Sequence, residues 1–326
     1  MVAADDEGDP AKAAELVREQ LGDTTVRLVV GPGSTDSFQA VKDQFAKAQV
    51  PNCVGGVADQ AVAQAPFSFR TALSARDRLA SLLAYLQRGR PEIKTVGLLE
   101  ETGVAAEGSD RQLTEQAPRY GLAYAGRVGL DGSSADEGPA LQQVVRAGAQ
   151  AVVLSSSTAA AARVSALLQA LDLQAKIQLL GLDGLEAYGF PAAAQDAAVG
   201  SIFAGTAQTY LTDLSPSSWP ARYREFVHGV TREYGYESNG VEIQGTAAVA
   251  DCVVQWSAAV QAAGTYRGPE VVRAWERLHL PASQTALGVP ERGSPSDHTT
   301  LHGDGLFVYV WAKTGAGYRL KQLSGP

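Results

Sequence analysis

Small polar residues follow several of the expected strands, and the first such group has the best-defined chemistry. Residues 29–37 read Val-Val-Gly-Pro-Gly-Ser-Thr-Asp-Ser, which predicts a strand, a glycine turn and the start of a helix. Free backbone N–H groups and the helix dipole at such a start attract an anion, and the hydroxyls of Ser34 and Thr35 add donors. Two interpretations stay open: these residues hold a ligand carboxylate, or a hydroxyl only caps the helix. The segment matches neither the phosphate-binding P-loop nor the dinucleotide pattern GxGxxG.

Three further strands are expected to end in small or acidic residues. They are followed by Gly-Gly-Val-Ala-Asp at 55–59, Ser-Ser-Ser-Thr at 155–158 and Gly-Leu-Asp-Gly at 181–184. Ligands of α/β folds bind at the carboxyl ends of parallel strands. Each group alone reads as an ordinary turn, but together they predict a cleft lined by hydroxyls, amides and the carboxylate of Asp183. That acid is either a turn residue bonded to its own backbone or the counter-charge of a ligand cation.

Catalytic and metal-binding patterns are weak in this sequence. It contains no GxSxG elbow of a serine hydrolase. Its four histidines are His228, His279, His298 and His302. Asp297, His298 and His302 fall in a Gly/Ser/Pro-rich stretch without metal-ligand spacing, so we expect a solvated loop there. The adjacent acids Glu100 and Glu101 are likewise expected to be solvated. We therefore expect that the protein is not an enzyme and that it binds no cofactor or metal ion. An α/β enzyme remains an alternative only if a residue of the cleft proves catalytic.

Short β-rich runs alternate with helical patterns along the first two thirds of the chain. The expected strands are residues 25–31, 50–55, 67–71, 95–100, 123–128, 151–155, 177–182 and 200–205. The first helix is expected to start at Pro10, with Asp9 as its N-cap. Such alternation is typical of parallel α/β sheets. Beyond residue 206, two successive helices (222–235 and 243–264) precede a last strand at 306–311 and an amphipathic tail, which indicates two lobes crossed more than once by the chain.

Composition narrows the class of protein further. The chain has 326 residues, 45% hydrophobic and 19% charged, with 27 basic against 35 acidic residues and a formal charge of −8. This balance argues against a nucleic-acid partner. Its apolar runs are too short for a membrane helix, and its first residues lack the regions of a signal peptide. Cys53 and Cys252 form no CxxC pair, so each is expected to be a small buried hydrophobic residue.

Several blocks of this sequence occur in the order found in one protein family. They are Asp-Asp-Glu-Gly-Asp-Pro-Ala-Lys-Ala at 5–13, Val-Val-Gly-Pro-Gly-Ser at 29–34, the run 50–55, Phe-Arg-Thr at 69–71, and the segments 95–100, 151–158, 180–184 and 200–205. In their order and spacing they resemble the type I periplasmic solute-binding proteins of the branched-chain amino acid (Leu/Ile/Val) class, which serve ABC transporters. The resemblance covers essentially the whole chain.

The resemblance implies an α/β fold of two Rossmann-like lobes with parallel sheets, joined by three hinge crossovers. Residues 1–73 and 206–304 would form the first lobe, and residues 74–205 and 305–326 the second. In the family a first β-α unit precedes the acidic block, and we expect that this unit is missing from the sequence, together with any signal peptide. The resemblance also implies a periplasmic or membrane-attached extracytoplasmic location, a monomer, and an ABC permease as partner.

The family binds its ligand between the lobes. By position, the resemblance assigns ligand contacts to eight residues: Ser34, Thr35, Gly56, Val57, Ala58, Ala105, Thr158 and Asp183. Ser34 and Thr35 match residues that hold the ligand carboxylate, and Asp183 matches an acid that pairs with the ammonium of amino-acid ligands. Ala105 and Thr158 stand where amino-acid binders carry tyrosines, which implies a roomier cleft. The expected ligand is therefore an amino acid or a larger or aromatic carboxylate; the alternative function is a ligand-sensing regulator or receptor domain of the same fold.

Overall fold

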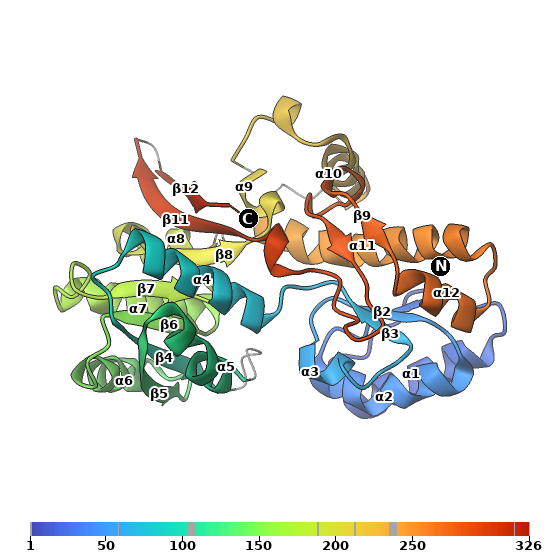
Figure 1. Ribbon diagram of the computed structural model, residues 1–326, viewed down its shortest axis with the longest axis horizontal. Coiled ribbons are helices and arrows are strands. Elements are labelled where there is room, and N and C mark those ends of the chain that lie inside the picture. The colour runs from blue at the N-terminus through green and yellow to red at the C-terminus, as the bar shows by residue number, and fades with distance from the viewer. Residues whose placement is uncertain are drawn as a thin grey trace. The chain divides into compact units, whose positions relative to one another are not determined.

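The computed structural model describes residues 2–57, 59–102, 108–187, 189–211, 213–234, 240–315 and 317–325, which form two compact units (Figure 1). Unit 1 comprises Met1–Ser74, Trp219–Ser238 and Glu242–Gly305. Unit 2 comprises Ala75–Ser218, Asn239–Val241 and Leu306–Pro326. Each unit thus joins segments that are far apart in the sequence.

Unit 1 is built on a parallel sheet with helices packed on both of its faces. Its described strands, in spatial order, are β1 (Val29–Val30), β2 (Asn52–Val54) and β3 (Ser68–Arg70). Its helices are α1 (Pro10–Gly22), α2 (Thr35–Ala48), α3 (Asp59–Val62), α10 (Ala221–Tyr234), α11 (Gly240–Ala263) and α12 (Gly268–Trp275). A hairpin follows, made of β9 (His279–Leu280) and β10 (Glu291–Arg292).

The alternation of side chains along the strands divides the core of unit 1 between the two faces. Val29 packs with residues of α1 and α2, such as Val17 and Phe45. Cys53 and Phe69, which are paired in register across β2 and β3, pack instead with residues of α11 and α12. Successive residues of a strand point to opposite faces, so these short strands can hold helices on both sides.

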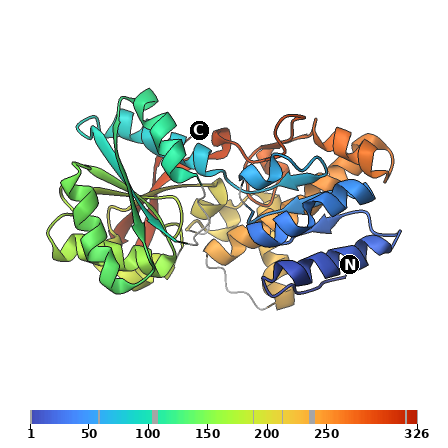
Figure 2. The ribbon, with the colours of Figure 1, turned by 90° about the horizontal axis from the view of Figure 1, so that it is seen from below.

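Unit 2 contains a larger sheet with the strand order β12-β11-β8-β7-β6-β4-β5 in its described residues (Figure 1). Helices lie on both sides of this sheet (Figure 2). The parallel strands are β4 (Thr95–Glu101), β5 (Ala123–Leu130), β6 (Ala151–Ser155), β7 (Gln178–Gly181) and β8 (Ile202–Gly205). The antiparallel strands are β11 (Phe307–Thr314) and β12 (Gly317–Ser324). Its helices are α4 (Ala75–Gly89), α5 (Ser109–Gln116), α6 (Ser134–Arg146), α7 (Thr158–Ala170), α8 (Gly189–Ala194) and α9 (Ala207–Leu211).

Strand β6, the middle one of the five described parallel strands, shows how the core of unit 2 is divided. Val152 and Leu154 join the cluster that contains residues of α6 and α7. Val153 joins the cluster that contains the leucines of α4 and Leu113 of α5. All three side chains are fully buried, and a continuous apolar run is what a strand covered on both faces requires.

The predicted α/β class, with parallel sheets in two lobes, is confirmed. Each expected strand has an observed counterpart, and Asp9 caps α1 by accepting a hydrogen bond from the backbone N–H of Ala11 at 2.8 Å. The tail expected only to be amphipathic is strand β12, which pairs with β11. No helix in the described part of the chain is both long and apolar enough to cross a bilayer.

A lobe boundary was expected at residue 206, but the segment after β8 still packs in unit 2. In the structure, Ala207–Leu211 and the turn after it belong to unit 2. Tyr309 of β11 donates to the Thr206 carbonyl oxygen at 3.0 Å, and the backbone N–H of Leu320 in β12 donates to Asp213 at 2.8 Å. The terminal hairpin therefore holds this segment in unit 2.

Cys53 of β2 and Cys252 of α11 are joined by a disulfide, with their Cα atoms 5.7 Å apart. The expectation that both are buried is met, but the expectation that they are separate hydrophobic residues is wrong. They are 199 residues apart in the sequence, and the packing of α11 on the sheet brings them together. Disulfides persist in oxidising compartments such as the periplasm and the cell exterior.

Candidate functional site

The turns that follow β1 and β2 lie directly against each other in unit 1. A Cβ atom placed on Gly56 would lie 2.7 Å from the carbonyl oxygen of Gly33, so the two backbones approach too closely for a side chain there. Ser34 follows Gly33 and Val57 follows Gly56. Four of the predicted ligand-contacting residues, Ser34, Thr35, Gly56 and Val57, therefore come from adjacent turns at the carboxyl edge of one sheet.

Ser34 caps helix α2. Its Oγ accepts a hydrogen bond from the backbone N–H of Ser37 at 3.2 Å, and Thr35 is the first residue of the helix. The interpretation of Ser34 as a helix cap is thus confirmed, whereas its contact with a ligand carboxylate stays a prediction. The two roles are compatible, because a helix start has several N–H groups and the cap satisfies one of them.

Arg70, which was not predicted as a site residue, ties the turn after β2 to the segment that follows β3. Its side chain is buried and donates to three backbone carbonyls: Val57 at 2.5 Å, Ala72 at 2.8 Å and Leu73 at 3.0 Å. Charge-assisted hydrogen bonds of this kind are about twice as strong as neutral ones. The signal in the sequence was an arginine inside an expected strand, but nothing in the sequence identified the groups that accept its hydrogen bonds. Val57 itself is buried in a small cluster with Phe38.

Two of the predicted residues, Ala58 and Ala105, lie outside the described residues. The remaining two, Thr158 and Asp183, lie at the carboxyl edge of the sheet in unit 2. Thr158 is the first residue of α7, which follows β6, and Asp183 follows β7. The turns after β6 and β7 are in close contact at Gly184, whose Cβ would lie 2.6 Å from the Ser156 carbonyl oxygen. Gly184 also has a φ of +78°.

Asp183 belongs to an ion-pair cluster. Its Oδ1 lies 3.3 Å from Nη1 of Arg78, and its Oδ2 accepts a hydrogen bond from Ser155 Oγ at 3.2 Å. The same Arg78 nitrogen lies 3.6 Å from Oε1 of Glu186 and donates to the Leu182 carbonyl. The carboxylate thus has tertiary partners, a role that neither of the two sequence interpretations anticipated.

Glu186 differs from Asp183 in its electrostatic surroundings. Burial raises the pKa of Glu186 to about 7, the nearby Arg78 opposes this rise, and the charge of Asp183 adds to it. Near neutral pH, Glu186 therefore exchanges between a carboxylate and a proton-donating acid. Neither Arg78 nor Glu186 could be predicted from the sequence, because only the packing of α4 beside the turn after β7 brings them together.

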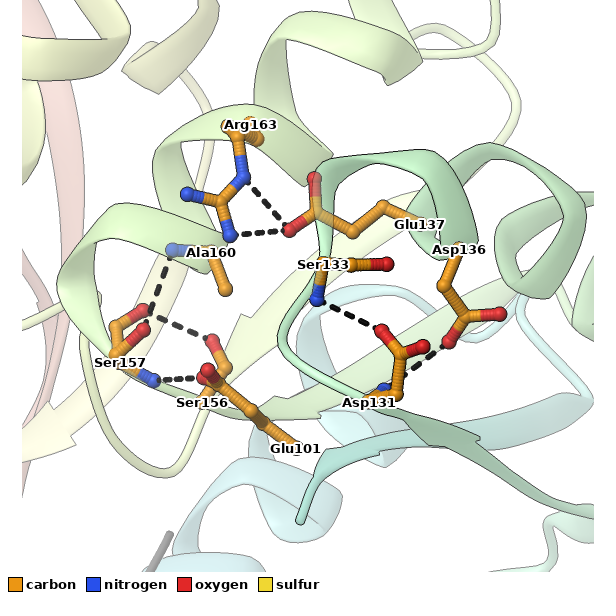
Figure 3. Close-up of polar contacts among 9 residues, drawn as sticks. All are labelled: Glu101, Asp131, Ser133, Asp136, Glu137, Ser156, Ser157, Ala160 and Arg163. Atoms are coloured by element: carbon orange, nitrogen blue, oxygen red, sulfur yellow. Dashed lines mark hydrogen bonds and ion pairs between the residues drawn. The ribbon is translucent and has the colours of Figure 1, made fainter. Parts of the chain in front are cut away.

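At the N-terminus of helix α7, a side chain of the protein itself accepts a hydrogen bond from a backbone N–H group (Figure 3). Oε2 of Glu101, at the end of β4, accepts a hydrogen bond from the backbone N–H of Ser157 at 2.7 Å, and Ser157 Oγ caps the helix by accepting from Ala160 N–H at 3.3 Å. The neighbouring Glu100 lies 2.5 Å from Nε of Arg127, and burial raises the pKa of Glu100. The expectation that both acids are merely solvated is wrong, because the parallel neighbours of β4 surround them.

The histidine-containing loop has a structural role. Nδ1 of His298 lies 3.0 Å from the Ser68 carbonyl oxygen, Nε2 lies 3.3 Å from Glu276, and the ring stacks on Phe69 at 4.3 Å. The side chain is 9% exposed, so the expected solvated loop is wrong at this position. Within the ranges that the structure describes, no group of three potential ligands is placed to hold a metal ion.

A hollow of about 460 Å³ in unit 1 lies away from these turns. It is lined by Val26 and Pro51, which precede β1 and β2, and by Tyr266 from the segment before α12. It therefore lies at the amino ends of the strands and is not part of the candidate site.

Comparison with known proteins agrees with this architecture. The sequence matches the family described as "Periplasmic binding protein" over residues 1–316. The chain belongs to this family, in its type I branch, and the predicted resemblance is confirmed. A comparison with curated proteins finds no match.

Solved structures share the fold at low sequence identity. A periplasmic binding protein type 1 from Bordetella pertussis Tohama I has a TM-score of 0.76 and 16% identity, covering 98% of this chain and 87% of that one. A substrate-binding protein of an ABC transporter from Sphaerobacter thermophilus has a TM-score of 0.81 and 19% identity, covering 99% and 85%. A solute-binding protein from Rhodopseudomonas palustris BisB5, in complex with 3,4-dihydroxybenzoic acid, has a TM-score of 0.76 and 16% identity, covering 99% and 85%. Family and fold are those of non-enzymatic solute-binding proteins.

Proposed function

We propose that this protein is an extracytoplasmic solute-binding protein that captures a small carboxylate-bearing ligand and delivers it to the permease of an ABC importer. The family match over residues 1–316 carries this proposal. The disulfide of unit 1 supports an oxidising location. The residues proposed to contact the ligand lie at the carboxyl edge of the sheet in each unit.

In this proposal the ligand carboxylate binds at the start of helix α2. That helix has fourteen residues, and its start adjoins the turn of Gly56 and Val57. The start of α7 in unit 2 is a poorer place for an anion, because the carboxylate of Glu101 already accepts the Ser157 N–H. Unit 2 is therefore proposed to contact the other end of the ligand through Thr158 and the residues around Asp183.

A thermal-shift screen against amino acids, keto acids and aromatic acids tests the proposal. A ligand at 100 times its Kd adds about 2.7 kcal/mol to the free energy of unfolding of a protein with one site. We expect at least one carboxylate to raise the melting temperature, with calorimetry confirming one site per chain. A screen in which no carboxylate raises the melting temperature contradicts the proposal.

The place of the carboxylate is tested with the Ser34→Ala/Thr35→Ala double variant. Losing one or two charge-assisted hydrogen bonds weakens binding by roughly 1.5–3 kcal/mol each. Asp9→Ala is the matched control, because it removes the N-cap hydrogen bond of helix α1 without touching the proposed site. Equal affinity of the double variant and the control would place the carboxylate elsewhere.

A further inference from the structure

The acid expected to receive a ligand cation is already paired inside unit 2. Asp183 lies 3.3 Å from the Arg78 guanidinium through Oδ1 and accepts from Ser155 through Oδ2. Its side chain is 24% exposed and that of Arg78 is 18% exposed, so water screens this pair only in part. An amino-acid ligand needs a free carboxylate here, because a buried ammonium without a counter-charge is strongly unfavourable.

Arg78 is held in this position from both of its ends. Its backbone belongs to the first turn of α4, and the next residue, Leu79, is fully buried in the core of unit 2. Its guanidinium contacts three groups from the turn after β7: the Leu182 carbonyl, Asp183 and Glu186. A ligand ammonium that displaced Arg78 from Asp183 would have to break this whole set of contacts.

When Glu186 is protonated, the charges of the cluster balance without a ligand cation, because Arg78 neutralises Asp183. Burial raises the pKa of Glu186 and so favours this protonated form. Among the described residues, Oε2 of Glu186 has no hydrogen-bond partner. A protonated Glu186 can donate to a hydroxyl or carbonyl oxygen, whereas an ammonium placed here would meet the positive charge of Arg78.

We infer that Arg78 takes the place that the ammonium of an amino acid would occupy, and that the ligand of this protein is a carboxylate without an α-amine. This inference rests on the proposed function, since it presumes that the carboxyl edge of unit 2 faces the ligand. It makes Arg78 and Glu186 specificity-determining residues and narrows the ligand class to keto, hydroxy or aromatic acids.

Pairs of probes that differ only in the amine test this inference by calorimetry. The pairs are 4-methyl-2-oxopentanoate with L-leucine, and phenylpyruvate with L-phenylalanine; each is measured with the wild type, Arg78→Met and Arg90→Met. The wild type should bind the keto acid of at least one pair tenfold or more tightly than its amino acid. Arg78→Met frees Asp183 and should shift that ratio at least tenfold toward the amino acid. Arg90→Met is the matched control, since Arg90 follows α4 at its other end and pairs with Glu92.

The possible failures are distinct. A wild type that binds the amino acid as tightly as the keto acid overturns this inference and leaves the proposed function standing. An unchanged ratio in a folded Arg78→Met variant overturns it as well. If no carboxylate in the wider screen binds, the proposed function fails and the inference fails with it.

A second variant covers the case in which Arg78→Met does not fold. Asp183→Asn keeps the shape of the side chain and leaves the charge of Arg78 unbalanced. The preference for the keto acid should then widen at least threefold, and a narrower preference would overturn the inference.

Discussion

Removing the disulfide between Cys53 and Cys252 should destabilise unit 1 strongly. The bond joins β2 to α11 and closes a loop of 199 residues, within which all of Ala75–Ser218 of unit 2 lies. Closing a loop of this length in the unfolded chain corresponds to roughly 5 kcal/mol in the chain-entropy model, and measured values are typically about 2–4 kcal/mol. We therefore expect the free energy of unfolding of unit 1 to fall by about 2–4 kcal/mol.

The measurements are urea denaturation and thermal melting of the oxidised wild type, the reduced wild type and the Cys53→Ala/Cys252→Ala variant. Reduced wild type keeps both sulfur atoms in the core, so it separates loss of the bond from loss of volume. A domain of this size loses roughly 2–4 °C of melting temperature per kcal/mol, so both comparisons should shift the melting temperature of unit 1 by about 4–16 °C. The double variant should be the less stable of the two, because it also leaves small voids beside Phe69 and Trp275.

Two results would refute this reasoning. The first is an identical unfolding midpoint for oxidised and reduced protein. The second is the labelling of two free thiols after the oxidised protein is unfolded without reductant, which would show that the bond does not form.

Three further substitutions test individual parts of the structure. Ser34→Ala removes the N-cap hydrogen bond of α2 and should cost about 1 kcal/mol in urea denaturation; no loss would mean that the cap is dispensable. Gly184→Ala should cost roughly 2–4 kcal/mol, because the residue has a φ of +78° and its new Cβ would lie 2.6 Å from the Ser156 carbonyl oxygen; a melting curve like that of the wild type would contradict this packing. Burial and the neighbouring Asp251 raise the pKa of Glu291 well above 4.5. Because the folded state then binds more protons than the unfolded state, the free energy of unfolding falls as the pH rises above about 4.5. Glu291→Gln carries no such charge, and its stability relative to the wild type should increase between pH 5 and pH 8; a difference that is independent of pH would show that Glu291 ionises without cost.

The elements of this fold could be predicted because their signals are local. Apolar runs bounded by glycine and proline predicted the parallel strands, and Asp9 before Pro10 predicted the start of α1, since a cap and its helix are adjacent in sequence. The strand β12 was missed because its alternation is weak and its partner β11 supplies the hydrogen bonds that make it a strand.

The candidate site could be predicted only in its outline. Glycine-rich and hydroxyl-rich strand ends predicted that these turns lie together at the carboxyl edges of the sheets, because parallel strands bring their carboxyl ends to one edge; their contact with a ligand stays a prediction. The partners at these edges come from distant segments: Arg70 reaches the Val57 carbonyl, and Glu101 reaches the N–H of Ser157. No local pattern encodes such contacts, since each depends on which strands are neighbours.

The sequence by itself determined the α/β class, the succession of strands and helices, and the polar turns that follow the strands. Only the tertiary structure decided that Cys53 is bonded to Cys252 and that Arg78 neutralises Asp183. The physical reason is the range of the interactions: strand and cap preferences act over a few residues, whereas these pairs are 199 and more than 100 residues apart and meet only after the sheets have formed.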